Sequence, residues 1–261
     1  MRDNVVFKVM TFNVRFDNPQ DGLHAWSFRK GLVARTVLDE APDLLGTQEC
    51  TKAQLAFLVE NLKGYRPCTP PRVPDDDPGV QMPTIFYKVQ HWVPRERGEF
   101  WLSDTPGVYR SKSWGAAFPR LFTYAKFYHL PGGVSLWFAN THLDHVSAEA
   151  RRKAACMIKD WVMAKRLPVV LVGDFNEGPG GDVQAILTRG RRGLKDAWSP
   201  LRYLEGDSTP TVHHFTGIGE GERIDWILMS PELEVLEAHL VTRSDGLPSD
   251  HFPCVATLRL A

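Results

Sequence analysis

Six short polar motifs lie at the ends of apolar stretches and carry the residue types needed to cleave a phosphoester. They supply carboxylate and amide oxygens, which suit a hard cation such as Mg²⁺ or Mn²⁺, and histidines, which titrate near neutral pH. In chain order the motifs are Thr11-Phe12-Asn13, Gln48-Glu49, Asn140-Thr141-His142-Leu143-Asp144-His145, Gly173-Asp174-Phe175-Asn176, Arg223-Ile224-Asp225 and Ser249-Asp250-His251. Because α/β proteins place ligand sites at the ends of buried strands, we expect the motifs to form one site.

The spacing inside two motifs predicts which side chains point the same way. Asp174 and Asn176 are two residues apart, so in an extended segment both side chains lie on one side. The same period places Asn140, His142 and Asp144 on a common face. A carboxylate with a neighbouring amide suits Mg²⁺ or Mn²⁺, which keep several waters that a substrate phosphate can displace.

Each motif also has a structural explanation when it is taken alone. Gly-Asp-Phe-Asn fits a tight turn closed by an Asx bond. Asp225 fits an ion pair with Arg223, His142 fits a hydrogen-bonded core histidine, and Ser249-Asp250-His251 fits a polar loop before the last strand. All of these explanations must hold together for the chain to have no site, so we favour a single catalytic site.

Composition indicates one domain over residues 1–261. The chain is 43% hydrophobic and 24% charged, which is enough for one large α/β core or two small ones, but no composition shift or internal repeat marks a boundary. Lys+Arg and Asp+Glu both number 31, so the formal charge is zero. This balance makes a protein that follows long nucleic acid less expected, because such proteins usually carry a basic excess.

The cysteines and the termini indicate the compartment. The four cysteines form no C-x-x-C pair, which argues against a zinc site or a disulfide framework and suits a reducing environment. The N-terminal residues do not resemble a targeting segment, and the chain has no apolar stretch of 18 residues. We expect a monomeric cytoplasmic protein that does not enter a membrane.

Apolar periodicity predicts alternating strands and helices with more hairpin-like spacing in between. Three loops are expected, at residues 67–83, 103–119 and 205–222. Helices are expected at about 28–40, between Thr51 as N-cap and Gly64, at 147–165 and at 182–188. Strands are expected at about 5–12, 44–49, 84–88, 121–129, 134–141, 169–172, 224–229 and 255–260. This order favours a mixed sheet sandwich flanked by helices.

Taken in this order, the six motifs resemble those of the endonuclease/exonuclease/phosphatase superfamily, which includes deoxyribonuclease I. The resemblance covers essentially the whole chain, and Gly-Asp-Phe-Asn and Ser-Asp-His are its most specific marks. It implies a four-layer α/β/β/α sandwich with one or two divalent cations at the top of the sheets. The extended Thr-His-Leu-Asp-His form resembles a bacterial branch, and the roles of Asp144 and His145 stay open.

The resemblance implies the metal ligands and the group that activates water. Asn13 and Glu49 would hold Mg²⁺, or Mn²⁺ in its place, with Asp250 as a further ligand or a carboxylate beside the ligands. Asp174 would orient or deprotonate the attacking water. Asn176 would contact the phosphate or the metal.

It also implies the groups that face the phosphate. His251 would face the scissile phosphorus, with Asp225 fixing its tautomer. His142 would bind a phosphate oxygen or assist the leaving group. Arg120 stands where the family often has a phosphate-binding arginine. The implied reaction is in-line attack by an activated water without a covalent intermediate, with the cation as Lewis acid.

Three functions follow from these residues. The first is a Mg²⁺-dependent phosphodiesterase, most commonly a nuclease on DNA or RNA, so the expected partner is a phosphoester and possibly a nucleic acid. The second is a phosphomonoesterase on a small sugar or inositol phosphate. The third is an inactive binding module, which requires a lost catalytic position, and none is missing. The chain has no insertion of the kind that grips duplex DNA, and its basic cluster Arg189–Lys195 is either a solvated turn or a substrate track.

Overall fold

Two six-stranded sheets form the centre of the molecule. The computed structural model describes residues 4–68, 76–77, 79–198, 209–243 and 245–260. The first sheet contains, in spatial order, β11 (Leu233–Leu240), β12 (Cys254–Leu260), β1 (Val5–Asn13), β2 (Leu44–Cys50), β4 (Met82–Lys88) and β3 (Tyr65–Pro67). The second contains β5 (Trp92–Trp101), β6 (Leu121–His129), β7 (Ser135–His142), β8 (Val169–Asp174), β10 (Asp225–Met229) and β9 (Lys195–Asp196).

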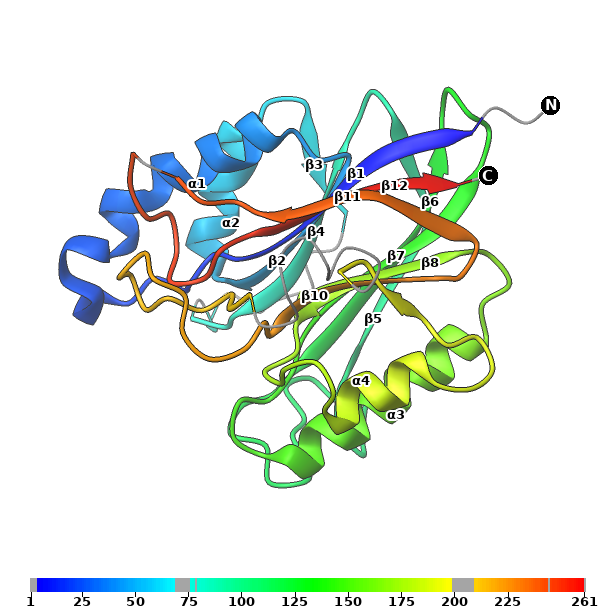
Figure 1. Cartoon of the computed structure of the whole chain (residues 1–261). Helices are drawn as coiled ribbons and strands as arrows, with labels where there is room; N and C mark the ends of the chain where they lie inside the picture. Colours follow the sequence, from blue (N-terminus) through cyan, green and yellow to red (C-terminus); the bar gives the residue numbers. More distant parts are fainter. Residues whose placement is uncertain (1–3, 69–75, 78, 199–208, 244, 261) are drawn as a thin grey trace.

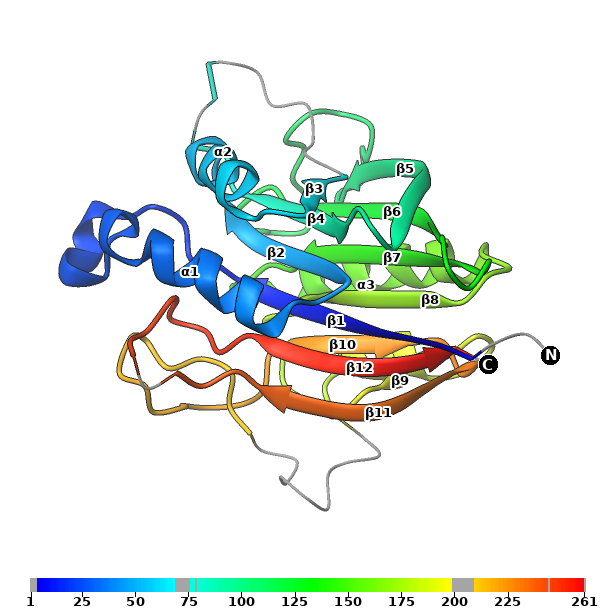
Figure 2. The same cartoon turned by 90° about the horizontal axis from the view of Figure 1, so that it is seen from above.

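Helices cover the outer face of each sheet. Figure 1 shows α1 (Trp26–Glu40) and α2 (Lys52–Asn61) on one side of the molecule, and α3 (Ala148–Met163) and α4 (Asp182–Thr188) on the other. Figure 2, turned by 90°, shows the strands of the first sheet side by side in the order given above. The four-layer α/β/β/α sandwich expected from the sequence is therefore confirmed. Among the described helices, none is both long enough and apolar enough to cross a bilayer.

Two parallel strand pairs bring the polar motifs to one edge of the sandwich. β1 pairs with β2 so that Asn13 lies opposite Gln48, and β7 pairs with β8 so that His142 lies opposite Asp174. A helical crossover joins the strands of each pair, as parallel pairing requires. All six residues of β8 are buried, as expected for its apolar run. The carboxyl ends of the four strands therefore meet at one place.

The interior between the sheets is apolar except near this edge, where amides join the two sheets. Asn140 on β7 donates hydrogen bonds to the carbonyl oxygens of Thr47 (2.9 Å) and Thr84 (3.0 Å) in the first sheet. It also accepts one from Gln48 Nε2 at 2.8 Å. The sheets approach closely here, because a Cβ added to Gly46 would lie 2.8 Å from Asn140 Cγ. Asn140 therefore links the two sheets by hydrogen bonds at this edge.

Most of the expected helices and strands lie within two residues of the observed ones. Thr51 caps α2 in a full capping box with Gln54, and Ser147 caps α3. Four strands were not anticipated, namely β3, β5, β9 and β11. β5 and β11 carry many charged and exposed residues, and each contains a register shift that interrupts the alternating pattern. Both lie at sheet edges, where the apolar signal of a strand is weakest.

Candidate active site

Side chains from both sheets converge at the shared edge. The first sheet contributes Asn13 and Glu49 from the ends of β1 and β2, and His251 from just before β12. The second contributes the remaining three groups, which are His142 and Asp174 at the ends of β7 and β8 and Asp225 at the start of β10. The expected convergence of the six motifs therefore occurs at the junction of the two sheets.

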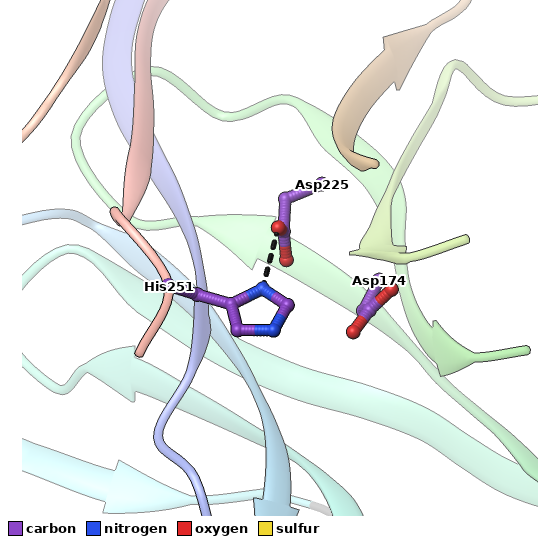
Figure 3. Close-up of side chains that lie close together, drawn as sticks. All are labelled: Asp174, Asp225 and His251. Carbon is purple, nitrogen blue, oxygen red and sulfur yellow. Dashed lines mark hydrogen bonds and ion pairs between the residues drawn. The ribbon is translucent and has the colours of Figure 1, made fainter. Parts of the chain in front are cut away.

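Asp174, Asp225 and His251 form the buried centre of this group (Figure 3). Asp225 lies opposite Asp174 in the β8–β10 pairing, and His251 Nδ1 lies 2.8 Å from Asp225 Oδ2. Each of the three offers a ligating atom within 4.8 Å of the other two. The geometry agrees with the predicted pairing of Asp225 with His251, and it adds Asp174 to the same cluster.

Asp174 accepts hydrogen bonds from two directions. Asn13 Nδ2 donates to Oδ2 at 3.0 Å, and the backbone N–H of Asn176 donates to Oδ1 at 3.0 Å. His142 Nε2 lies 3.4 Å from Oδ2. The bond from Asn176 is an Asx turn, so the structural explanation of Gly-Asp-Phe-Asn and the site explanation hold together. Asn176 has φ 50°, and its amide donates to the carbonyl oxygen of Leu143 at 3.0 Å.

Glu49 has a strained backbone at the end of β2. Its φ is 62°, in the left-handed region that residues other than glycine and asparagine rarely adopt. Glu49 also falls where the register between β2 and β4 shifts. The carboxylate accepts hydrogen bonds from Asn13 Nδ2 at 3.2 Å and from the backbone N–H of Phe16 at 3.0 Å. These contacts turn the Glu49 carboxylate toward Asn13 and the centre of the site.

Asp250 is held by an arginine that the sequence analysis did not single out. Arg15 Nη1 lies 3.6 Å from Asp250 Oδ2, and Arg15 also forms a two-point pair with Asp21, at 3.1 and 3.0 Å. The Ser249 hydroxyl lies 3.2 Å from Asp250 Oδ1. Asp250 therefore borders the site with an ion-pair partner of its own. The only sequence signal for Arg15 is its place two residues after Asn13.

Arg120 and Asp144 belong to the opposite wall. Asp144 accepts backbone hydrogen bonds from two loop segments, with donors at Ala117, Phe118, Val146 and Ser147. Arg120 donates from Nη2 to His145 Nδ1 at 3.2 Å, and its Nε lies 3.9 Å from Asp144. Within the described chain, Arg120 Nε is buried without a hydrogen-bond partner. Asp144 thus holds the loops around Arg120 by these hydrogen bonds. It lies beyond the end of β7, so the prediction that it shares a strand face with Asn140 and His142 is wrong.

The two histidines have opposite proton affinities. Burial alone would lower the pKa of His251, but the adjacent Asp225 carboxylate outweighs it and raises the pKa to about 10. Burial, together with the positive charge of Arg120, holds the pKa of His142 well below its ordinary value. Burial and the nearby Asp225 carboxylate raise the pKa of Asp174 to about 7. At neutral pH the site therefore combines a cationic histidine, a neutral histidine and a carboxyl group close to its titration point.

The donor set fits a divalent cation. Asn13 Nδ2 donates to both the Glu49 and the Asp174 carboxylates, and Asp225 lies in one cluster with Asp174. Among the described residues, His251 is the only cationic side chain that contacts Asp225. Asp225 Oδ1 is buried without a hydrogen-bond partner in the described chain, which is costly for a carboxylate oxygen unless something compensates its charge. Oxygen-rich sites of this kind suit hard cations.

Two cavities open on either side of Glu49. The smaller, of about 140 Å³, is lined by Arg110, Arg120, His142 and Phe118 among others. The larger, of about 600 Å³, is bounded by Asn176, His251 and a segment that the sequence analysis treated only as a loop. That segment contributes Val212, His214, Phe215, Glu220 and Glu222, and the other lining residues are Arg15, Asp21, Glu49, His145, Ile224 and Asp250. Glu49 lines both cavities, so a molecule bound beside it can extend in two directions.

The sequence profile of the Endonuclease/Exonuclease/phosphatase family matches residues 10–251. The chain belongs to this family. Its members are enzymes that hydrolyse phosphoesters, and they generally depend on a divalent metal, so the chain is a phosphoesterase of the same superfamily. The resemblance inferred from the six motifs is thereby confirmed at the level of the family.

Solved structures agree with this assignment. An endonuclease/exonuclease/phosphatase family protein from Bacteroides thetaiotaomicron is 29% identical, with a TM-score of 0.88 over 100% of this chain and 97% of that one. The mannosyl-6-phosphatase Bt3783 of the same organism is 30% identical, with a TM-score of 0.80 over 97% and 99% of the two chains. The human nocturnin catalytic domain, at 20% identity and a TM-score of 0.75 over 98% and 96%, shows the same fold.

A curated relative is more distant in sequence. The uncharacterized protein L388 of Acanthamoeba polyphaga mimivirus is 27% identical over 180 residues. The matched part spans 65% of this chain and 66% of the viral protein.

Proposed function

We propose that this phosphoesterase hydrolyses small phosphate monoesters with an activated water and a divalent cation, Mg²⁺ or Mn²⁺. The observation that carries the proposal is the buried Asp174–Asp225–His251 cluster, which has a cationic cavity on the His142 side and an acidic cavity on the His251 side. The chemistry follows from the cluster, and the substrate class follows from the cavities.

Asp174 is the group suited to activate water. Its pKa of about 7 places it close to physiological pH, where a general base is most effective. Asn13 and the backbone of Asn176 hold its carboxylate in place, and His142 lies 3.4 Å from it with an uncharged ring. Asp174 therefore takes the proton of the attacking water, while His142 contributes a hydrogen bond at the same oxygen or to the phosphate.

His251 acts as an electrostatic donor rather than as a base. With Nδ1–H bonded to Asp225, its Nε2–H is free to donate to a phosphoryl oxygen, and its raised pKa keeps the ring cationic. Asn13 and Glu49 would hold the cation, with Asp250 beside them as a further ligand. When bound, the cation polarises a phosphoryl oxygen and stabilises the leaving alkoxide.

The smaller cavity fits the phosphate itself. Arg120 and His142 line it, and the buried Nε of Arg120 has no hydrogen-bond partner among the described residues. Arginine presents paired N–H donors that match phosphate oxygens. Arg120 therefore binds the non-bridging oxygens of the substrate, with Asn176 as a further contact from the side of the larger cavity.

The larger cavity fits an uncharged polyhydroxylated leaving group. Its volume of about 600 Å³ lies in the range of small-molecule sites. Five carboxylates face two cationic side chains in its lining, Arg15 and His251, and Arg15 is already paired with Asp21. Glu220 and Glu222 are exposed and make no ion pair within the described chain. Such a wall accepts hydrogen bonds from hydroxyl groups and repels a second phosphate.

These features favour a small monoester over the nuclease that led the expectations from sequence. The basic cluster Arg189–Lys195 lies away from the site, because Lys195 pairs with Met229 at the end of β10 opposite to Asp225. With zero net charge, the chain also lacks the basic excess that proteins following long nucleic acid usually carry. The similarity to a protein described as a mannosyl-6-phosphatase also supports a sugar phosphate as the substrate.

A substrate panel with Mg²⁺ or Mn²⁺ tests the proposal. We expect faster release of phosphate from a hexose 6-phosphate than from a hexose 1,6-bisphosphate, a bis-aryl phosphodiester, short RNA or plasmid DNA. Glu220→Gln with Glu222→Gln should narrow the difference between the two hexose phosphates by about tenfold, since two charges that repel the second phosphate are lost.

Glu60→Gln on α2 is the matched control, because Glu60 is exposed and α2 contributes no lining residue to the larger cavity. It should leave the preference unchanged. Preferential cleavage of RNA or DNA over every monoester would overturn the assignment of substrate. Absence of hydrolysis on the whole panel would overturn the proposed function.

A further inference from the structure

The Asp225–His251 pair joins two different sheets. Asp225 is the first residue of β10 in the second sheet, whereas His251 lies three residues before β12 in the first sheet. Hydrogen bonds within a sheet fix each residue relative to its own strand neighbours. They do not fix the distance of 2.8 Å between His251 Nδ1 and Asp225 Oδ2, so a contact between the two sheets must hold these two backbone segments in place.

A three-residue segment, Thr211–His213, lies between these two backbones. The Thr211 hydroxyl oxygen accepts hydrogen bonds from the backbone N–H of Ile224 at 3.0 Å and of Asp225 at 3.2 Å. The Thr211 carbonyl oxygen accepts one from the backbone N–H of Phe252 at 2.7 Å. One residue therefore contacts the backbone of Asp225 through its side chain and the backbone next to His251 through its main chain.

The rest of the segment reinforces the contact with His251. The backbone N–H of His213 donates to the carbonyl oxygen of Asp250 at 2.8 Å, and Val212 forms an antiparallel bridge with His251. Thr211 is fully buried, so water does not compete for its hydroxyl. A second link between the strands, from Cys254 Sγ to the carbonyl oxygen of Asp225 at 3.5 Å, is a weaker sulfur contact.

We propose that Thr211 is a positioning residue that sets the placement of Asp225 against His251. Its hydroxyl oxygen holds the first residue of β10, while its carbonyl oxygen holds the chain beside His251. The geometry stands without any assumption about substrate, and the catalytic consequence rests on the proposed function. Small displacements of catalytic groups are expensive in rate, so the loss of this hydroxyl acts on turnover more than on substrate binding.

Three substitutions test the role in hydrolysis of hexose 6-phosphate with Mg²⁺. Thr211→Val keeps the shape and removes the acceptor, and we expect kcat to fall by about ten- to a hundredfold while KM changes less than about twofold. Thr211→Ser keeps the hydroxyl and should restore kcat to within about threefold of the wild type. Thr211→Ala also removes the hydroxyl and leaves the two N–H groups to a less firmly held water. It replaces Thr211→Val if the valine variant does not fold.

The control is Thr36→Val on α1. Thr36 is equally buried and donates its hydroxyl to the carbonyl oxygen of Leu32 at 2.8 Å, away from the site. This substitution should leave kcat unchanged. If Thr211 had only a structural role, Thr211→Val and Thr211→Ala would yield less folded protein, but the folded fraction would keep the wild-type kcat.

A spectroscopic measurement decides the proposal independently of activity. The short hydrogen bond between His251 Nδ1–H and Asp225 should give a low-field proton resonance that disappears in His251→Ala. We expect Thr211→Val, or Thr211→Ala in its place, to shift or broaden this resonance and Thr211→Ser to keep it. A folded variant without the hydroxyl that retains both the resonance and the wild-type kcat overturns the inference. If no phosphoester is hydrolysed, the resonance alone decides.

Discussion

Replacing Asp174 with Asn is expected to stabilise the metal-free protein at pH 8 while abolishing hydrolysis. Asp174 is buried, and burial together with the Asp225 carboxylate raises its pKa from 3.8 to about 7. A carboxyl group whose folded-state pKa is raised contributes stability below its unfolded pKa and loses that contribution as the pH rises through the folded value. In the wild-type protein without metal, the contribution of Asp174 to stability should therefore be lost between about pH 4 and pH 7.

The size of the effect follows from the two pKa values. The difference between 3.8 and about 7 corresponds to roughly 4 kcal/mol in the free energy of unfolding. Asparagine carries no charge at any pH, so the variant does not lose this contribution. It does lose the hydrogen bond that Asn13 donates at 3.0 Å, at a cost of about 1 kcal/mol. The variant should be more stable than the wild type by roughly 3 kcal/mol at pH 8 and less stable by about 1 kcal/mol at pH 4.

Urea unfolding followed by tryptophan fluorescence in EDTA measures this difference at each pH. Comparing the two proteins isolates Asp174 together with its interaction with His251, because the Asp174 carboxylate is one of the charges that raise the pKa of His251. Asp160→Asn on α3 replaces an exposed carboxylate and serves as the control, with no comparable crossover. A stability difference between Asp174→Asn and the wild type that stays constant from pH 4 to pH 8 would refute the reasoning. Mg²⁺ at a hundred times the Kd of the wild-type protein should stabilise the wild type by about 2.7 kcal/mol. The same concentration should stabilise the variant by less, because the variant has lost one carboxylate charge at the site.

Three further outcomes are expected. EDTA should abolish hydrolysis, Mg²⁺ or Mn²⁺ should restore it, and Glu49→Ala should lose both activity and the response to metal; full activity in chelator would contradict the metal dependence. Asp225→Asn should lower kcat by orders of magnitude with little change in fold, and combining it with His251→Ala should cost little more than His251→Ala alone, whereas multiplied defects would show that the two residues act separately. Binding of short DNA should depend weakly on salt, with a slope of magnitude below about 3 in a plot of log affinity against log salt; a steeper slope would assign Arg189–Lys195 to a substrate track.

The interior strands could be predicted because their signal is local. β8 reads as a run of apolar residues, and the polar motif Gly173–Asn176 begins where that run ends. The same pattern marks the ends of β1, β2 and β7. The edge strands β5 and β11 carry no such signal, because one face of each is exposed and tolerates charge. Their pairing depends on partners that are distant in the sequence.

The sequence by itself determined which donors and acids are present and that they follow buried strands, since side-chain chemistry and apolar periodicity are properties of short segments. Only the tertiary structure decided what each group contacts. It paired Asp250 with Arg15, used Asn140 to join the sheets, and placed Asn13 against Asp174, 161 residues away. Burial and charged neighbours set the proton affinity of a side chain, and both depend on segments that meet only when the two sheets pack together.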